Sequence, residues 1–417
     1  RYSNMQRLTE AAVGVMASGM ANNLANQEDF RNATPNPKML ELITSEDLSV
    51  IIIGSGSPLI QPGRVGPCTA IVGGGNFFLV DCGPASFRVI RFLGLPLGRL
   101  SGIILTHYHS DHIGDLGEIM TFSWIGGNSK LPVYGPEGVQ EVVHGFNEAY
   151  TLDKGYRIAH HGADLLPPEN HGYVTNVIPP VPEGQDNIIV FHDEASGFTI
   201  KGFEVNHYPV KPAYGYKFEL NGRTTVVSGD TCKCNSLLKN AMKCDLLVQE
   251  AICCEIIGTM AKKFKDKKHK NTIRQAKFLD DIIDYHTPIQ DGFDLAAEAQ
   301  VTEMVFSHLV PTPANMLLEN IFFLYGKKPS NWNGTATVGA DGMIFTIGNN
   351  HNVKLVSSAL VKRTNPYRAA GQIGTVLAGF LYYIARRNKN VRNVSLLVGA
   401  AALLTWFRSQ PDFVSRM

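Results

Sequence analysis

The sequence lacks a strong excess of either charge, a dense set of cysteines and an apolar run long enough to cross a bilayer. Because 38 Lys and Arg stand against 37 Asp and Glu, the formal charge of +1 gives no overall attraction to nucleic acid or anionic lipid. Seven cysteines in 417 residues lack the regular spacing of a disulfide scaffold or a zinc knuckle, which favours a reducing compartment. The chain is 44% hydrophobic and can bury a full-sized core, in one large domain or two ordinary ones.

One local excess of charge contrasts with this overall balance. Between Lys262 and Lys270, six lysines surround a single acidic residue, Asp266. Such a run is expected to be an ordinary solvated face, and contact with phosphate groups is the alternative.

Composition divides the chain into three parts. Residues 1–46 are expected to form a helix and an Asn/Pro-rich linker arm, and residues 47–350 a domain in which strands precede helices. Val50 to Ile53 and Phe77 to Val80 are typical of buried strands, and the same order of strands before helices recurs after Thr199. The two halves predict two sheets packed face to face with helices outside, which is an α+β, four-layer αββα sandwich.

A dense group of metal-ligand side chains follows the predicted strand from Gly102 to Leu105. His107, His109, Asp111 and His112 occur within six residues. Side chains 107 and 109 of an extended segment project to the same side, and the turn that follows swings the other two towards a neighbouring point. One short loop can therefore serve two ions. Imidazole and carboxylate suit zinc, with manganese or iron possible, whereas a surface cluster of polar loop residues does not explain this density.

The run from Thr106 to His112 resembles the His-x-His-x-Asp-His loop of the metallo-β-lactamase superfamily, over roughly residues 48–348. Members of this superfamily complete the site with later ligands, and His207, Asp230 and His308 follow strand ends in the expected order. The resemblance implies two Zn²⁺ ions, one held by His107, His109 and His207, the other by Asp111, His112 and His308, with Asp230 bridging both. It also implies that a water between the ions becomes the hydroxide nucleophile.

Two further motifs resemble elements of ribonuclease Z and of its arylsulfatase-like relatives. Gln249-Glu250-Ala251 is similar to their His-Glu-Ala element, and His286-Thr287-Pro288 to their His-Ser/Thr element. The resemblance implies that His286 contacts the substrate oxyanion or protonates the leaving group, and that Glu250 orients it. Asp111 is grouped with these two as a predicted catalytic residue. A plain helix-start role is the alternative for His286.

Loop lengths give two expectations about the substrate. The stretch from Phe203 to Phe218 looks most like the arylsulfatase-like branch, and only Glu219 to Thr225 separates it from the next strand. That leaves no room there for the Gly/Pro-rich arm of many transfer-RNA processing members, so tRNA is disfavoured and a small-molecule ester is expected. Residues 145–188 are predicted to form a lid insertion, with lid or surface roles preferred over metal binding for its histidines, His160, His161 and His171.

The carboxyl-terminal residues 351–417 contain two apolar runs, 369–385 and 394–407, joined by a basic connector. Both runs are shorter than the roughly 20 residues that span a bilayer. They predict a helical hairpin that inserts shallowly, which would make the protein membrane-associated through residues 369–407. Docking on the domain or on another subunit is the alternative.

Together these features predict a dinuclear zinc hydrolase that cleaves a phosphodiester, a sulfate ester or a related ester with a metal-bridging hydroxide. Two alternatives stay open. The first is a lactonase, because the same metals open lactones, and the second is a metal-retaining structural subunit of a membrane-associated complex.

Overall fold

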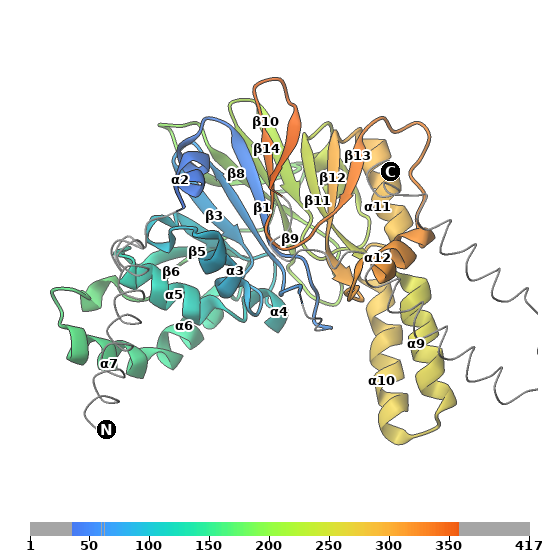
Figure 1. Cartoon of the computed structure of the whole chain (residues 1–417), viewed down its shortest axis with the longest axis horizontal. Helices are drawn as coiled ribbons and strands as arrows, with labels where there is room; N and C mark the ends of the chain where they lie inside the picture. The colour runs from blue at the N-terminus through green and yellow to red at the C-terminus, as the bar shows by residue number, and fades with distance from the viewer. Residues whose placement is uncertain (1–35, 60, 62, 358–417) are drawn as a thin grey trace, which may run out of the picture.

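The fold is a sandwich of two mixed sheets, seen in a computed structural model that describes residues 36–59, 61 and 63–357. Within these residues, the first sheet has eight strands in the order β15-β14-β1-β2-β3-β4-β5-β6 and the second has seven, β13-β12-β11-β10-β9-β8-β7 (Figure 1). The first contains β1 (Leu48–Gly54), β2 (Cys68–Gly73), β3 (Asn76–Val80), β4 (Gly102–Ile104), β5 (Leu131–Gly135), β6 (Tyr173–Val177), β14 (Met343–Ile347) and β15 (Val353–Ser357). The second contains β7 (Ile188–His192), β8 (Thr199–Glu204), β9 (Tyr214–Leu220), β10 (Arg223–Val227), β11 (Leu246–Ile252), β12 (Glu303–Val310) and β13 (Thr335–Val338).

Helices cover the outer faces of both sheets (Figure 1). Those that follow strands of the first sheet are α3 (Ser86–Leu93), α4 (Ser110–Ile113), α5 (Leu116–Ile125), α6 (Val139–Ala149) and α7 (Thr151–His161), preceded by α2 (Pro37–Thr44). The helices of the second half are α8 (Asn235–Ala241), α9 (Cys254–Asp266), α10 (Lys270–Asp281), α11 (Ile289–Ala299) and α12 (Met316–Phe322). Of these, α9 and α10 pair with each other and extend away from the sheet (Figure 1). The predicted α+β four-layer sandwich is therefore confirmed.

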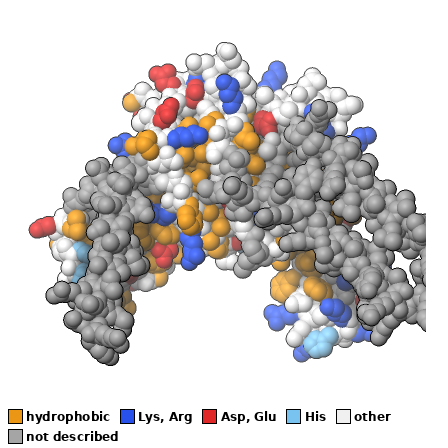
Figure 2. Space-filling model, in the orientation of Figure 1, with side chains coloured by type: hydrophobic (Ala, Val, Ile, Leu, Met, Phe, Trp, Pro, Cys, Tyr) orange, Lys and Arg blue, Asp and Glu red, His pale blue; other side chains and the backbone are white. Residues whose placement is uncertain are grey.

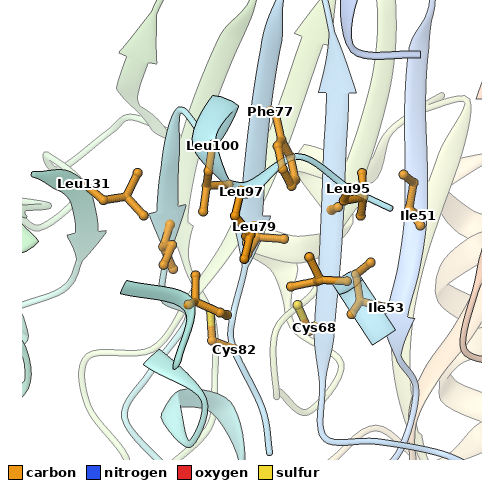
Figure 3. Packing of buried hydrophobic residues seen from close by; sticks show 14 of the residues in the cluster. Ile51, Ile53, Cys68, Phe77, Leu79, Cys82, Leu95, Leu97, Leu100 and Leu131 are labelled. Atoms are coloured by element: carbon orange, nitrogen blue, oxygen red, sulfur yellow. The ribbon is translucent and has the colours of Figure 1, made fainter. Parts of the chain in front are cut away.

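Strand β1 shows why the sandwich has separate cores. All of its residues are buried, and successive side chains of a strand point to opposite faces. Ile51 and Ile53 join the core between the first sheet and its helices, whereas Val50 and Ile52 join the core between the two sheets. In Figure 3, Leu97 and its neighbours lie against the helix side of the same sheet. Both faces of β1 are therefore buried in a core, which explains why apolar β-branched residues occupy consecutive positions in this strand.

The two sheets share one organisation, and it places the site. Each sheet combines a run of antiparallel strands with a run of parallel ones, and the parallel runs are β3 to β6 in the first sheet and β10 to β13 in the second. The carboxyl ends of parallel strands meet at one edge of a sheet, so the loops after β4, β10, β11 and β12 converge.

Two predicted segments have definite places in the fold. Helix α2 buries Met39, Leu42 and Ile43 against the first sheet, so the packed part of the chain begins earlier than residue 47. Residues 145–188 contribute the end of α6, α7 and the edge strand β6, and none of their side chains lines the pocket between the sheets or joins the His/Asp groups of the site.

The tail with the predicted hairpin, 369–407, lies outside the described residues, so membrane contact stays a prediction. In the part of the chain that the structure covers, no helix combines the length and apolar character needed to cross a membrane.

Candidate metal centre

The loop after β4 carries the first half of the site. His107 is fully buried, and its Nε2 lies 2.9 Å from Nδ1 of the exposed His109. The short helix α4 then turns the chain, so that Asp111 and His112 face the same interior from the other side, with 3.6 Å between Asp111 Oδ2 and His112 Nε2. The loop therefore presents two pairs of ligand atoms, as its spacing predicts.

The predicted later ligands come from the second sheet and complete two groups. Ligand atoms lie within 4.8 Å of one another in the group His107, His109, His207 and Asp230, and equally in the group Asp111, His112 and His308. Asp230 lies between the groups: its Oδ2 is 3.3 Å from His112 Nε2 and 3.4 Å from His308 Nε2, and 3.9 Å from His107 Nε2 and 4.0 Å from His207 Nε2. The structure thus brings all seven predicted ligands together, in the arrangement that a bridging carboxylate requires.

Gly229 fixes the position of Asp230 after β10. Its φ is +62°, and a Cβ there would lie 2.5 Å from the carbonyl oxygen of Tyr214. Any other side chain would push β10 away from β9, so glycine is needed at this turn. Asp230 itself is almost fully buried.

Burial and neighbouring charges set the protonation of the ligand side chains. Burial alone would raise the pKa of Asp230, but His308 and His112 outweigh it and hold that pKa well below its usual range. Burial lowers the pKa of His107 well below its ordinary value and that of His207 to about 4. Burial alone would also lower the pKa values of His112 and His308, but Asp230 outweighs it, raising the pKa of His112 well above its ordinary value and that of His308 to about 9. Without metal, the Asp230 carboxylate therefore lies between the neutral imidazoles of His107 and His207 and the protonated ones of His112 and His308, and metal binding would displace those two protons.

Hydrogen bonds at Nδ1, the ring nitrogen opposite the proposed metal-binding Nε2, orient two of the imidazoles. Asp81 Oδ2 accepts from His112 Nδ1 at 2.7 Å, and the carbonyl of Tyr285 accepts from His207 Nδ1 at 2.9 Å. Each bond leaves the opposite ring atom, Nε2, buried and without a hydrogen-bond partner. Buried polar atoms without partners are rare, and an imidazole that donates through one nitrogen commonly binds metal through the other. The donor set fits divalent metal.

Asp81 and Tyr285 are functional candidates that the sequence reasoning missed. Asp81 also accepts from the backbone N–H and the hydroxyl of Thr106, both at 2.8 Å, so it anchors the start of the ligand loop. Asp81 could have been found from the sequence, because it comes directly after the predicted strand that ends at Val80, just as Asp230 follows a predicted strand. Tyr285 acts through its backbone carbonyl, which leaves no signal in the sequence.

The predicted pair of Glu250 and His286 adjoins the two groups, and a ligand atom of His286 lies within 4.8 Å of those of Asp230 and His308. Glu250 lies near the carboxyl end of β11. Its Oε1 accepts from His286 Nδ1 at 3.1 Å and from the backbone N–H of Thr287 at 2.9 Å and of Thr231 at 3.1 Å. The ring of His286 stacks on that of His308, with centroids 5.5 Å apart. Glu250 thus fixes the orientation of His286 next to the ligand cluster.

The histidines of the 145–188 segment lie elsewhere. His171 is buried edge-on against Trp124, with centroids 4.8 Å apart, and His160 and His161 pack on each other at the end of α7. None belongs to the His/Asp groups found among the described residues. The lid role itself stays a prediction.

Comparison with known proteins supports the same family as the geometry. The family model described as the metallo-beta-lactamase superfamily matches residues 62–233. Ribonuclease Z of Mycolicibacterium gilvum is 34% identical over 269 residues, which cover 64% of this chain and 85% of that protein. The chain belongs to the metallo-β-lactamase superfamily.

A second relative and a solved structure are consistent with this family. Ribonuclease Z of Mycobacterium marinum is 35% identical over 270 residues, covering 63% of this chain and 87% of that protein. The crystal structure of the short form of human tRNase Z superposes with a TM-score of 0.50 at 18% identity, covering 71% of this chain and 98% of that one, and so shares the fold. The likeness to arylsulfatase-type relatives stays a prediction.

The expectation that tRNA is disfavoured is wrong, because relatives matched over most of their length are named ribonuclease Z and the human protein of like fold is a tRNase Z. The error has a physical reason. The connection from β9 to β10 is indeed only a tight turn at Asn221 and Gly222, both with positive φ. A missing arm at that position says nothing about other projections, and in this superfamily member α9 and α10 form a long helical hairpin that leaves the sandwich elsewhere (Figure 1).

Proposed function

We propose that this protein is a metal-dependent ribonuclease that hydrolyses phosphodiester bonds in RNA, with a transfer-RNA precursor as the first substrate to test. The observation that carries the proposal is the Asp230 carboxylate between two groups of imidazole ligands, beside the His286–Glu250 pair. The identity of about a third with proteins named ribonuclease Z supports RNA over other esters.

Two divalent cations, with zinc as the first choice, complete the proposed site. His107, His109 and His207 would hold one, Asp111, His112 and His308 the other, and Asp230 would be shared. When bound, the ions would polarise the phosphoryl group and acidify water for attack. Support comes from the buried Nε2 atoms of His112 and His207, which have no hydrogen-bond partner.

We assign the proton transfers of the reaction to side chains of the protein. In hydrolysis a bond forms between the water oxygen and phosphorus while the bond from phosphorus to the leaving sugar oxygen breaks, and that oxygen takes up a proton. We assign the proton to His286, because Nδ1–H donates to Glu250 and leaves Nε2 as the ring atom for the substrate. Glu250 orients that ring through its hydrogen bond, and Asp111 is the candidate acceptor for the proton of the attacking water.

The test uses the purified full chain. Metal content is measured by mass spectrometry, and turnover is measured on a transfer-RNA precursor, bis(p-nitrophenyl) phosphate, p-nitrophenyl sulfate and a set of lactones. We expect about two metal ions per chain and metal-dependent cleavage of RNA and of the phosphodiester. A chain without metal or turnover would overturn the proposal, and so would hydrolysis confined to lactones or sulfate.

A further inference from the structure

The α9–α10 hairpin concentrates positive charge that the rest of the molecule does not have. Residues 254–281 contain eight cationic and four acidic side chains, a net charge of +4, against +1 for the whole chain. All eight cations are exposed, and we call them the hairpin basic surface: Lys262, Lys263, Lys265, Lys267, Lys268, Lys270, Arg274 and Lys277. Figure 2 shows Lys and Arg side chains over the far end of this hairpin. The remaining chain is therefore slightly acidic.

We propose that the hairpin basic surface binds the phosphate backbone of the RNA substrate at a distance from the cleaved bond. This inference rests on the proposed ribonuclease function. It assigns the grip on RNA to α9 and α10, and the chemistry to the ends of the strands.

The two ends of the hairpin that join the domain both lie next to residues of the candidate site. Helix α9 begins four residues after Glu250, and α10 runs through the 3-10 turn Ile282–Asp284 into Tyr285 and His286. The Tyr285 carbonyl accepts from His207 Nδ1. A ligand held along the hairpin is therefore led to the His/Asp cluster.

The hairpin has its own small core, which holds it at a set direction. Ile257 and Ala261 of α9 are buried with Ala276 and Leu279 of α10, against residues at the ends of β11 and β12. Since the packing face of α10 contains 276 and 279, the positions 270, 274 and 277 form a separate stripe one turn apart. The cations on α10 thus point away from the packing face, as a binding surface requires.

The reach of the hairpin selects a large substrate. Because an α-helix rises 1.5 Å per residue, the 13 residues of α9 carry the lysines at its end about 20 Å from its root. Charges interact over only about 8 Å at physiological ionic strength, so these lysines have no effect on a small ester at the site. A polyanion that extends from the site along the hairpin meets all of them.

Ion pairing leaves most of the surface available for phosphate. Within the described residues, only two of the eight cations have a carboxylate partner: Lys265 with Asp280 at 2.6 Å, and Lys277 with Asp281 at 2.7 Å. In addition, Phe278 is 60% exposed, with the guanidinium carbon of Arg274 5.8 Å from its ring centroid. An exposed ring beside a cation is a platform on which an unpaired base can stack.

The main test neutralises the five lysines at the end of the hairpin that lack carboxylate partners, in one variant: K262Q, K263Q, K267Q, K268Q and K270Q. The matched control removes five exposed lysines from other elements: K38Q, K130Q, K243Q, K327Q and K354Q. Circular dichroism and turnover of bis(p-nitrophenyl) phosphate check the fold and the site. We expect both variants to keep that turnover, and only the hairpin variant to show a KM for RNA raised tenfold or more.

Salt dependence is the second readout. Each phosphate contact contributes about 0.7 to 0.9 to the slope of log affinity against log salt concentration. For five lost contacts we expect the hairpin variant to lose about 3.5 to 4.5 units of this slope, measured by fluorescence anisotropy with labelled RNA, and the control to lose about none. Equal KM values and equal slopes in hairpin variant and control would overturn the inference.

A second variant tests the aromatic platform. Phe278→Ala should raise the KM for RNA about tenfold, because stacking of a base on an aromatic side chain contributes roughly 1–3 kcal/mol. Phe92→Ala is the matched control, since Phe92 is an 80% exposed ring on α3. Equal KM values for the two variants would remove Phe278 from the binding surface.

Two outcomes separate this inference from the proposed function. If the unmodified protein binds RNA through the hairpin but cleaves none, the proposed function fails and the binding surface stands. If it cleaves RNA and the hairpin variant cleaves equally well at equal KM, only the hairpin inference fails. Loss of binding to phosphatidylserine vesicles with RNA binding unchanged would identify the hairpin as a membrane surface and overturn the proposal.

Discussion

The His/Asp cluster and the α9–α10 hairpin are built in opposite ways. In the cluster, His107, His112 and Asp230 are almost completely buried and lie within a few ångströms of one another. In the hairpin, the cations are exposed and only two have carboxylate partners among the described residues. A reaction centre depends on exact distances, so one lost side chain should abolish it, whereas phosphate binding adds many weak, screened contacts. The two regions should therefore fail independently.

The sharpest separation of the two regions comes from Asp230→Ala. Removal of the shared carboxylate should release metal and reduce hydrolysis by at least about a thousandfold, since the ions contribute several kcal/mol to stabilising the transition state. RNA binding by the hairpin should persist. Metal analysis, phosphodiesterase assays and anisotropy measure these effects, with exposed Asp186→Ala as the control. A variant with two ions and normal turnover would contradict the role of Asp230.

His286→Ala separates chemistry from metal binding inside the cluster. We expect unchanged metal content and a kcat for RNA lower by about 10² to 10⁴, the usual contribution of general acid–base catalysis. The loss should be much smaller with bis(p-nitrophenyl) phosphate, because p-nitrophenolate leaves without a proton. The control is His192→Ala, an exposed histidine of β7. Equal losses with both substrates would contradict proton donation by His286.

Asp81→Asn tests whether the hydrogen bond between Asp81 and the ligand His112 contributes to metal affinity. The change removes the charge that accepts from His112 Nδ1 and should weaken metal binding about 10- to 100-fold. Asp245→Asn is the matched control, because Asp245 is a buried carboxylate that accepts from His351 at 2.9 Å, and His351 belongs to neither His/Asp group. Competition with a zinc-binding dye measures the affinity. Equal affinity in the two variants would remove Asp81 from the support of the site.

The smallest expected effect is the pH dependence of stability in protein freed of metal by a chelator. Burial alone would lower the pKa of His308, but Asp230 outweighs it and raises the pKa from 6.5 to about 9. That contribution to stability is complete below pH 6.5 and is lost as the pH rises to about 9. Burial lowers the pKa of His207 from 6.5 to about 4, so stability also falls as the pH drops from 6.5 to about 4, where the unfolded state takes up the proton first.

The metal-free protein should therefore unfold at the highest temperature near pH 6.5. Thermal denaturation followed by circular dichroism from pH 5 to pH 9.5 measures this. Protein with zinc added serves as the control and should not lose stability between pH 6.5 and 9, because bound imidazoles are already neutral. A midpoint that rises steadily to pH 9.5 without metal would contradict the raised pKa of His308.

The fold and the ligand set could be predicted for different reasons. Continuous β-branched runs such as Val50 to Ile53 predict strands because both of their faces must be buried, and they occur as expected in β1. The short loop after β4 could be interpreted because its residues are neighbours in the chain. Helix α2 and the edge strand β6 were missed, because what they pack against is decided by distant residues. The prediction about tRNA failed for a related reason. It rested on the short β9–β10 connection alone, whereas the α9–α10 hairpin extends from another part of the sandwich.

The sequence by itself determined the chemistry available: imidazoles and carboxylates placed directly after buried strands, and a run of lysines in one segment. Only the tertiary structure decided which of them act together. Asp230 and His308 approach the first loop because parallel strands of the two sheets end at a common edge, and His207 joins them from the end of the antiparallel strand β8. That convergence depends on contacts between residues far apart in the chain. The same packing turns Asp81 and the Tyr285 carbonyl into supports, and it places the lysines on a hairpin rooted at the site.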